Sequence, residues 1–413
     1  MNTFNFHNKL TLLFLLGLVF HFNGYASNDT FGTKTEQKPP IKLGTTLVLS
    51  GINKAIGANA KQGIEVLFFK VNAAGGIQGR KLELVALDDG YNAKRAAENV
   101  YTFINNSEIL ALIGVTSTTN NLVILPIVNE HKILLYAPFS GAEFMRKTPP
   151  DRYVINFRAG HTEELKGLIE SVLEIGIKPE EIAFFLQNDA FGDSVYDTAI
   201  AIMKEKGVPK EVIAQMPKGR YTANTLNVES ALATIIQEAK HAPKAIILGG
   251  TKAPVAKFID LAIQEFPNVL FFATSGNTDL FTETFSDKAI VIVTEIVPNI
   301  DSDLPGVKEY RENLQAFAPG AQPNSRSLAA YLSAKLLVIA LEKATTENKL
   351  SREGIIDTLE SLKDIDLGID LKISLDKNQH QALHKVWPVQ LYNKKYSPYN
   401  STTLKEMMKN QSK

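Results

Sequence analysis

The chain contains no cysteine among its 413 residues. This absence excludes disulfide bonds, thiolate metal sites, cysteine nucleophiles and an anchor formed by a lipid-modified cysteine. Neither sign of charge is in excess, because 44 lysines and arginines stand against 44 aspartates and glutamates. The charge balance therefore gives no electrostatic reason to expect a nucleic acid or an anionic membrane as a partner.

Long apolar runs are also missing. The longest is residues 10–20, which is too short to span a bilayer, since a spanning helix needs about 20 residues. Small residues follow it at Gly24 and Ala26, the −3 and −1 positions of a cleavage site. We interpret residues 1–26 as a secretory signal peptide cut after Ala26, with a buried helix or an uncleaved anchor as the alternative. Residues 27–40 are polar and read as a flexible lead-in, so we expect an exported protein with no lipid anchor.

Catalytic signatures are not found either. The sequence has no GxSxG, HExxH or GxxxxGK[ST] motif. The nearest approach to a metal pair is His380 and His384 in HQALH, which lacks an acidic third ligand nearby and is interpreted as a solvated loop. A hydrolase or a dehydrogenase is therefore disfavoured, and no metal or cofactor is expected.

What the chain does have is a regular alternation of short β-branched runs and longer helical runs. This order predicts βαβ units and parallel sheets with helices on both faces. The predicted strands of the first part are 41–49, 81–88, 109–115 and 132–138. The helices between and after them are 59–72, 93–105 and 119–130.

The pattern restarts after residues 148–152. The predicted strands there are 154–159, 182–187, 211–216, 244–250 and 269–275, and the helices are 162–174, 193–206, 225–240 and 253–265. The last part differs, with strands at 289–298, 367–375 and 385–392 and helices at 307–317, 328–344 and 352–361. We expect an α/β protein with two doubly wound sheets in series. The order strand, polar loop, Gly, helix at 41–59 recurs at 182–194.

The segment NAAGGIQGRKLELVALDDG, residues 72–90, is rich in glycine and ends in two carboxylates. Its glycines follow a helix and precede a strand, whereas a phosphate loop needs the reverse order. Gly75 and Gly76 are instead predicted to end the helix. Asp88 and Asp89 are adjacent in a strand and point to opposite faces, so we predict capping and turn-forming roles rather than an acid–base pair. Asp193 is predicted to cap the helix at 193–206.

Six polar loops of small residues follow predicted strands, three in each half. They are 49–57, 115–121, 138–144, 187–192, 249–254 and 274–279. Ligands of open α/β sheets gather at the carboxyl ends of the strands, and helix N-termini there present free N–H groups. Two sheets that face each other across such edges make a cleft that suits a small molecule.

These residues resemble those of a known family, the extracellular solute-binding proteins of the leucine/isoleucine/valine-binding type that serve ABC transporters. The resemblance covers residues 41–392 and lies in IKLGTTLVLSG, NAAGGIQGRKLELVALDDG, ALIGVTSTTN, LLYAPFSGAE, FRAG, FFLQNDAFG and IILGG. The family implies a type I periplasmic-binding fold, with two lobes joined by three crossing segments. The implied bounds are 41–155 plus 298–380 for lobe one, 156–297 plus 385–400 for lobe two, a tail at 401–413, and crossings near 153–158, 294–299 and 376–386.

The resemblance also implies where a ligand binds. In lobe one its polar head would meet three loops, represented here by Ser50, Gly51, Thr116, Ser117, Thr118, Phe139, Ser140 and Gly141. In lobe two, Phe191 corresponds to an aromatic residue that closes over the ligand.

Three positions depart from the family pattern. Ile56 stands where an aromatic residue is usual, Thr251 or Lys252 replaces a tyrosine, and Ser275 replaces the acid that accepts the ligand's ammonium group. An α-ammonium group would then lack its partner, at a cost of about 1–3 kcal/mol or more. These departures argue against a branched-chain amino acid, and Lys252 favours a negatively charged or carbonyl-bearing ligand.

The sequence thus predicts a monomeric periplasmic binding component of an ABC importer that holds an amino acid or a related amide or carboxylate and delivers it to an inner-membrane ABC permease. Two alternatives stay open. One is a soluble ligand sensor for a membrane receptor, and the other is a carrier of an apolar ligand for a non-ABC system. The apolar carrier is allowed by three phenylalanines near the expected cleft, Phe139, Phe144 and Phe191.

Overall fold

The first half of the chain forms a parallel sheet. A computed structural model describes residues 38–106, 108–277, 289–402 and 404–405, so the expected signal peptide lies outside the described residues, as does most of the lead-in and of the tail. The sheet has the order β2-β1-β3-β4-β5, and every neighbouring pair is parallel. Its strands are β1 (Ile41–Leu47), β2 (Leu82–Asp88), β3 (Ile109–Ile113), β4 (Leu135–Tyr136) and β5 (Val154–Ile155).

A second sheet follows in the order β14-β13-β10-β9-β8-β6-β7. Its strands are β6 (Ile182–Gln187), β7 (Lys218–Tyr221), β8 (Ala245–Gly249), β9 (Leu270–Ala273), β10 (Ile290–Glu295), β13 (Trp387–Tyr392) and β14 (Lys395–Pro398). Only the last two break the parallel arrangement, since β13 is antiparallel to both β10 and β14. Without them, the five parallel strands repeat the strand order of the first sheet. The predicted α/β architecture of two doubly wound sheets is confirmed.

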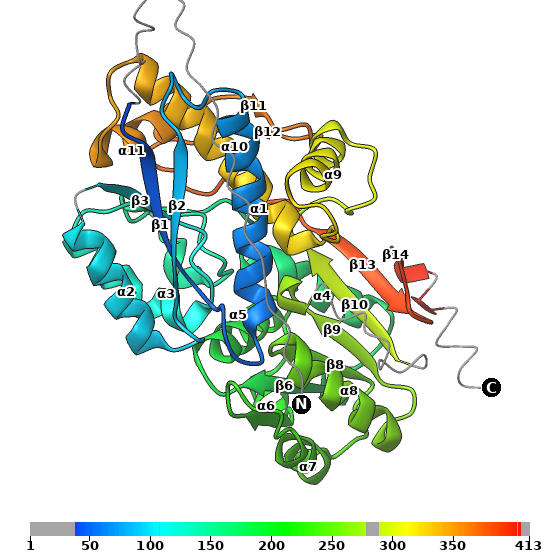
Figure 1. The fold of residues 1–413 in the computed structure, drawn as a ribbon. Coiled ribbons are helices and arrows are strands. Elements are labelled where there is room, and N and C mark those ends of the chain that lie inside the picture. The colour runs from blue at the N-terminus through cyan, green and yellow to red at the C-terminus, as the bar shows by residue number, and fades with distance from the viewer. Residues whose placement is uncertain (1–37, 107, 278–288, 403, 406–413) are drawn as a thin grey trace, which may run out of the picture. The chain divides into compact units, whose positions relative to one another are not determined.

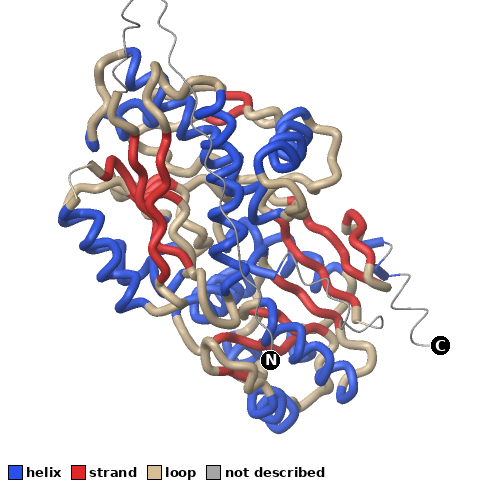
Figure 2. The backbone as a smooth tube through the Cα atoms, viewed as in Figure 1, coloured by secondary structure: helices blue, strands red, loops and turns tan. Residues whose placement is uncertain are grey.

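Helices cover both faces of each sheet, as Figures 1 and 2 show. In the first half they are α1 (Lys54–Ala73), α2 (Ala93–Asn105) and α3 (Thr118–Glu130). In the second they are α4 (His161–Glu174), α5 (Ala190–Glu205), α6 (Lys210–Ala214), α7 (Glu229–Glu238) and α8 (Lys252–Glu265). Buried leucine, isoleucine, valine and phenylalanine side chains fill the layers between helices and strands.

The chain then returns to the first sheet through α9 (Pro305–Phe317), α10 (Ser325–Thr346) and α11 (Arg352–Glu360). Helix α10 packs against α1 so closely that a Cβ atom on Gly63 would come within 2.0 Å of the Ser327 carbonyl oxygen. The same buried cluster joins residues of β1 and β3 to residues of α10 and α11. We call the part built on the first sheet, with α9 to α11, lobe one, and the part built on the second sheet lobe two (Figure 1).

Segments that pass between the lobes lie side by side. The Asn156 amide donates to the His380 carbonyl oxygen at 2.7 Å, and the Ala382 amide donates back to the Asn156 carbonyl oxygen at 2.9 Å. The first and third crossing segments are therefore hydrogen-bonded to each other, which fits the expected two-lobe fold.

The duplicated order of strand, loop, glycine and helix has a packing reason. A Cβ atom on Gly57, in the first turn of α1, would come within 2.3 Å of the Val48 carbonyl oxygen. A Cβ atom on Gly192, in the first turn of α5, would come within 2.0 Å of the Gln187 carbonyl oxygen. In both lobes the glycine lets the helix start directly against the end of the preceding strand.

Two strand predictions were wrong, and one strand was missed. Residues 211–216 lie largely in the short helix α6, because the spacing of Ile213 and Met216 buries one side of a helical turn. The strand of that unit is β7, which begins at Lys218. Residues 367–375 contain only β12 (Lys372–Ile373), paired with β11 (Ile365–Asp366) in a small separate sheet. Strand β14 was not predicted.

Predictions for single residues had mixed outcomes. Gly75 follows the C-cap of α1 with a φ of 101°, as predicted for a helix end. Asp88 accepts the N–H groups of Leu49 and Gly90, and Asp89 accepts that of Tyr91, all at 2.8–2.9 Å, but Asn92 caps α2. Asp189, not Asp193, caps α5.

The prediction that residues 380–384 form a solvated loop was wrong for His380. His380 is buried against the crossing segment, where it contacts the Val154 carbonyl oxygen at 2.9 Å and Glu360 at 3.1 Å. His384 is exposed. No cluster of three potential metal ligands occurs in the described part of the chain. No helix there is both long enough and apolar enough to cross a membrane.

Candidate functional site

The strand order fixes where a ligand can enter each sheet. In the order 2-1-3-4-5, the chain leaves the first and third strands toward opposite faces, and the loops after them open a crevice. In lobe one these strands are β1 and β3, and in lobe two they are β6 and β8. The loops after β3 and β8 supply Ser117 and Thr251 to the cavity described next. The helices that follow β1, β3 and β6 supply Ile56, Thr118 and Phe191.

A small cavity of about 50 Å³ lies among these loops. Groups from both lobes line it: Ile56, Tyr91, Ser117, Thr118, Phe139, Ser140, Gly141, Arg158, His161, Phe191, Thr251, Thr274, Gly276 and Arg326. No aspartate or glutamate occurs among these lining residues. The described part of the lining is therefore polar and rich in hydroxyl groups.

Hydroxyl groups of lobe one gather at the N-terminus of α3. Ser117 accepts a hydrogen bond from the Asn120 amide at 3.3 Å and caps this helix. Its φ of 76° lies in the left-handed region, which a residue with a side chain occupies at a cost of about 1–3 kcal/mol. The hydroxyls of Thr118 and Ser140 lie 3.0 Å apart. Free N–H groups of the first turn and these hydroxyls together suit an acceptor such as a carboxylate.

Polar side chains connect the two lobes beside the cavity. Gln187 of lobe two donates to the Tyr91 hydroxyl of lobe one at 2.8 Å, and its own carbonyl oxygen accepts from the Tyr221 hydroxyl at 2.7 Å. Thr119 of lobe one donates to Asp189 of lobe two at 2.8 Å. These contacts hold the cleft closed.

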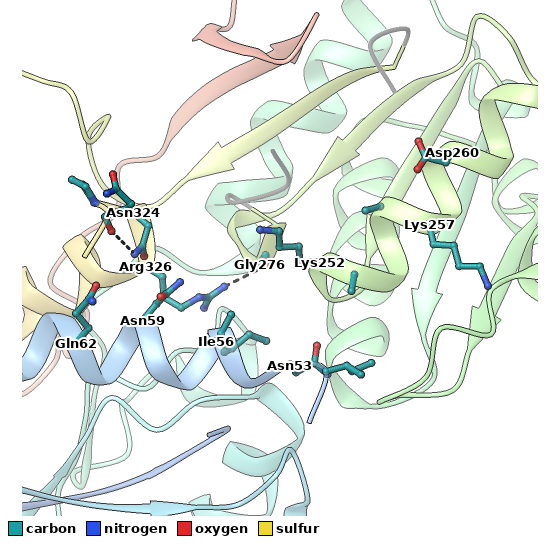
Figure 3. A pocket seen from close by; sticks show the side chains of 16 residues that line it. Asn53, Ile56, Asn59, Gln62, Lys252, Lys257, Asp260, Gly276, Asn324 and Arg326 are labelled. Atoms are coloured by element: carbon teal, nitrogen blue, oxygen red, sulfur yellow. Dashed lines mark hydrogen bonds between the residues drawn. The ribbon is translucent and has the colours of Figure 1, made fainter. Parts of the chain in front are cut away.

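A second and wider cavity of about 640 Å³ opens beside the small one, lined by the start of α1, by α8 and by the segment before α10 (Figure 3). Figure 3 shows Arg326 reaching from α10 toward Gly276, to which it donates at 3.4 Å, and Lys252 projecting from the start of α8. Ile56, Gly276 and Arg326 line both cavities. A ligand too large for the small cavity would therefore extend into the wide one.

A buried ion pair stands at the wall of the small cavity. Arg158 donates to Glu164, which is fully buried in the first turn of α4. The other carboxylate oxygen of Glu164 accepts from the Ser275 amide at 2.6 Å and from the Thr294 hydroxyl at 3.1 Å. Both oxygens therefore already accept hydrogen bonds from the protein.

His161 is the one titratable imidazole among the lining residues. Burial, followed by the charges of Arg158 and Arg146, lowers its pKa well below the usual value, so the ring is neutral at physiological pH. One ring nitrogen lies 2.8 Å from the Ser194 hydroxyl. His161 also packs against the Phe191 ring at a centroid distance of 5.9 Å.

The structure brings most of the predicted site residues together. Those that line the small cavity are Ile56, Ser117, Thr118, Phe139, Ser140, Gly141, Phe191 and Thr251. Lys252 lines the wide cavity only. The residues that line neither are Ser50, Gly51, Thr116 and Ser275, and Phe144 lies in a separate surface pocket.

Two of these exceptions have a structural role beside the cavity. The Thr116 hydroxyl accepts the Val48 amide at 3.2 Å, which ties the β1 and β3 loops together. The Ser275 amide binds Glu164. Ser275, which stands where the family has an acidic residue, therefore lies next to Glu164, a carboxylate that α4 supplies.

Sequence reasoning missed six lining residues: Tyr91, Arg158, His161, Thr274, Gly276 and Arg326. A signal existed for Arg158, which stands in the quoted FRAG motif of the first crossing, and for Thr274, which opens one of the six loops. Arg326 gave no such signal, because it lies on a helix that only the return of the chain to lobe one brings to the cleft.

Comparisons with known proteins agree with this fold. The family model described as "Periplasmic binding protein" matches residues 40–395. A solved structure of a possible leucine/isoleucine/valine-binding protein from Rhodopirellula baltica is 33% identical, with a TM-score of 0.83 over 90% of this chain and 99% of that one. A branched-chain amino acid ABC transporter protein from Thermus thermophilus with bound valine is 16% identical, with a TM-score of 0.76 over 88% and 96% of the two chains.

A relative in Pseudomonas aeruginosa, described as an amino acid binding protein, is 20% identical over 84% of this chain and 92% of its own length. Proteins of this family bind small solutes, typically work with ABC permeases and are exported to the periplasm. The matched region includes the first sheet and the second sheet up to the start of β14. The chain therefore belongs to the periplasmic binding protein family, in the group with leucine/isoleucine/valine-binding relatives.

Proposed function

We propose that this protein is the substrate-binding subunit of an ABC-type importer. It holds one small organic solute, an amino acid or a related amide or carboxylate, between its lobes and releases it chemically unchanged to an inner-membrane permease. The observation that carries this proposal is the small cavity, which takes its walls from the switch-point loops of both sheets. The valine bound to the Thermus thermophilus protein supports a solute of this kind.

The ligand contacts follow from the lining. Hydroxyls of Ser117, Thr118 and Ser140 and the first amides of α3 meet the polar head, and Phe191 packs over it from lobe two. Thr251 contributes from the β8 loop. Lys252 faces the part of the ligand that lies in the wide cavity. Ser50, Gly51, Thr116 and Ser275 support these groups from behind.

Binding is coupled to hinge closure in this proposal. The hydrogen bonds from Gln187 to Tyr91 and from Thr119 to Asp189 exist only when the lobes are together. A ligand that contacts both lobes binds the closed state better than the open one and shifts the population toward it.

The test begins with the protein purified from the periplasm and freed of bound solute by reversible unfolding. A thermal-shift screen of amino acids, carboxylates, amides, nucleobases and sterols identifies binders, since a ligand at 100 times its dissociation constant stabilises by about 2.7 kcal/mol. Small-angle X-ray scattering then measures closure, and proteoliposomes that contain a candidate partner permease measure uptake. Binding with a decrease in the radius of gyration and protein-dependent uptake is expected. Turnover of the bound compound, or closure without uptake, would contradict the proposal.

Processing and lobe bounds belong to the same proposal. We infer cleavage after Ala26, a monomeric mature protein, and lobes spanning 41–155 plus 298–380 and 156–297 plus 385–400. Intact mass measurement of the exported protein checks the cleavage position, and sedimentation checks the oligomeric state. A mature N-terminus other than Ser27 would contradict the first inference.

A further inference from the structure

The wide cavity continues the small one along helix α1. Ile56 and Gly276 line both cavities, so the two spaces meet at these residues. The small cavity, at about 50 Å³, is large enough for a head group only, since one water takes about 30 Å³. The wide cavity, at about 640 Å³, is within the range of about 300–1,000 Å³ that holds a complete drug-sized ligand. The two spaces together suit a solute that is longer than a single free amino acid.

Two side-chain amides of α1 belong to the wall of the wide cavity. Asn59 and Gln62 both line it, and their spacing of three positions places them on the same side of the helix. Figure 3 shows this arrangement, with Lys252 across the cavity at the start of α8. Ile56 precedes both amides on α1 and lies beside the small cavity. The wall therefore changes from an apolar residue at the small cavity to hydrogen-bonding groups farther along the helix.

Gln62 has hydrogen-bonding capacity that the protein does not use. Its side-chain oxygen Oε1 is buried and accepts no hydrogen bond from any described residue. Buried polar atoms are nearly always hydrogen-bonded, so this oxygen points to a donor that a ligand brings. The last side-chain torsion of a glutamine is soft, and rotation about it turns the oxygen toward a ligand in the cavity. An alkyl tail has no donor and would leave the oxygen unsatisfied, whereas an amide N–H would satisfy it.

Distances along α1 set the length of such a ligand. Gln62 follows Ile56 by six positions, which is about 9 Å along the helix axis, and its side chain leans back toward the N-terminus. An extended peptide spans at most about 3.3–3.6 Å per residue. Two or three peptide residues therefore reach from the small cavity to the Gln62 amide.

Resting on the proposed binding function, we infer that the natural ligand is an amide-linked solute of the length of a dipeptide or tripeptide. Its head group occupies the small cavity, and its body passes Ile56 and Gly276 into the wide cavity. There an amide N–H donates to Gln62, and Asn59, whose amide both donates and accepts, completes the pairing with the same amide group. Lys252 donates to a carbonyl or carboxylate oxygen of the distal part.

Peptide length is the direct test. A thermal-shift screen of the full-length exported protein covers glycine, alanine, leucine, glutamine and the di-, tri- and tetrapeptides built from them, and isothermal titration then measures the best binders. We expect the best dipeptide or tripeptide to bind at least tenfold more tightly than each of its amino acids, than its extension by one residue, and than 2-aminodecanoate, which replaces the amides by an alkyl tail.

The outcomes separate this inference from the proposed function. A free amino acid or 2-aminodecanoate that binds as tightly as the best peptide would overturn the inference and leave the proposed function standing. Binding of another small solute from the broader thermal-shift screen, with no peptide binding, would do the same. If no compound in either screen binds, both the inference and the proposed function fail.

N-methylated peptides and a variant pair locate the distal hydrogen bond. Methylation of the peptide N–H that meets Gln62 should weaken the best peptide at least tenfold. Gln62→Met keeps the length of the side chain and removes its amide. It should weaken the parent peptide at least fivefold but leave the affinity of that N-methylated analogue unchanged, because the shared hydrogen bond is already lost. Gln237→Met, an exposed glutamine on α7 that is not among the described lining residues, is the control and should change neither affinity. Equal losses for the parent and for every N-methylated analogue in Gln62→Met would show a merely structural role and overturn the assignment of this residue.

Discussion

Gln187, at the end of β6, donates a hydrogen bond of 2.8 Å to the hydroxyl of Tyr91 in the opposite lobe. Both side chains are buried beside the small cavity. Gln187 also donates to Asp189 at 2.6 Å and accepts from Tyr221, so it joins the end of β6 to two further elements of lobe two. Contacts within lobe two thus position the Gln187 side chain, and closure of the lobes adds Tyr91 as a further hydrogen-bond partner.

Removal of this hydrogen bond should favour the open state. We expect Tyr91→Phe to cost about 1 kcal/mol of closure, because Gln187 keeps Asp189 as an acceptor and is not left unsatisfied. Ligand affinity should fall roughly fivefold, measured by titration, with a larger radius of gyration at partial saturation. Tyr101→Phe, an exposed tyrosine on α2, is the control and should change neither quantity. An unchanged affinity in Tyr91→Phe would show that this contact does not contribute to closure.

The two glycines at the helix starts give a stability prediction. Because added Cβ atoms would lie 2.3 and 2.0 Å from backbone oxygens, Gly57→Ala and Gly192→Ala should each lower the free energy of unfolding by about 1–3 kcal/mol or more. Gly167→Ala in α4, where nothing lies within 4 Å of the new methyl group, should raise it by about 0.5–1 kcal/mol. Urea denaturation measures all three, and equal effects would contradict the packing argument.

The buried pair of Arg158 and Glu164 should be costly to break. Arg158→Met leaves a fully buried carboxylate without its cation, and we expect a loss of about 3–5 kcal/mol in the ligand-free protein. The double variant Arg158→Met with Glu164→Gln should recover much of this loss, since neither charge remains. Arg220→Met, which breaks a solvent-exposed pair with Asp193, should cost less than about 1 kcal/mol. A double variant no more stable than the single one would contradict this account.

Acid should destabilise the protein partly through Glu309. Burial alone would raise the pKa of this carboxyl, but hydrogen bonds from Lys335 and Lys70, and then from Tyr331, hold it at about 2. The folded pKa lies below the unfolded value, so the stability that Glu309 contributes is complete above about pH 4.5 and is lost as the pH falls toward 2. Between pH 4.5 and 2, the free energy of unfolding should therefore fall by about 1–3 kcal/mol less in Glu309→Gln than in the wild type.

Free energies of unfolding measured from pH 2 to 7 check this slope. Glu312→Gln, an exposed position on the same helix, serves as the matched control. A slope between pH 4.5 and 2 that is the same in Glu309→Gln and in the wild type would show that the Glu309 cluster is not responsible.

Local patterns along the chain predicted the fold well, because each βαβ unit carries its own periodicity. Residues 93–105 and 182–187 coincide with α2 and β6. Prediction failed at 211–216, where the spacing of apolar residues fits both a helix and a strand. It also failed at β14, which only its pairing with β13 defines as a strand.

The site was harder to predict for a related reason. Ser117, Thr118 and Ser140 belong to loops that follow neighbouring strands, so strand order alone brings them together. Arg158 and Arg326 are 168 positions apart in the chain and reach the cavity from a crossing segment and from α10. Their meeting depends on how the chain returns to lobe one, which no short-range pattern encodes.

The ladder between Asn156 and the 380–383 segment limits how the molecule can move. Two of the connections bend as a single ribbon, because Asn156 and Phe157 exchange three backbone hydrogen bonds with His380, Ala382 and Leu383. A paired ribbon resists shear and twist more than an isolated strand, so we expect opening to be a bend about this ribbon. A donor and an acceptor fluorophore, one on each side, would then report solute occupancy as a single distance, which makes this chain a suitable scaffold for a biosensor.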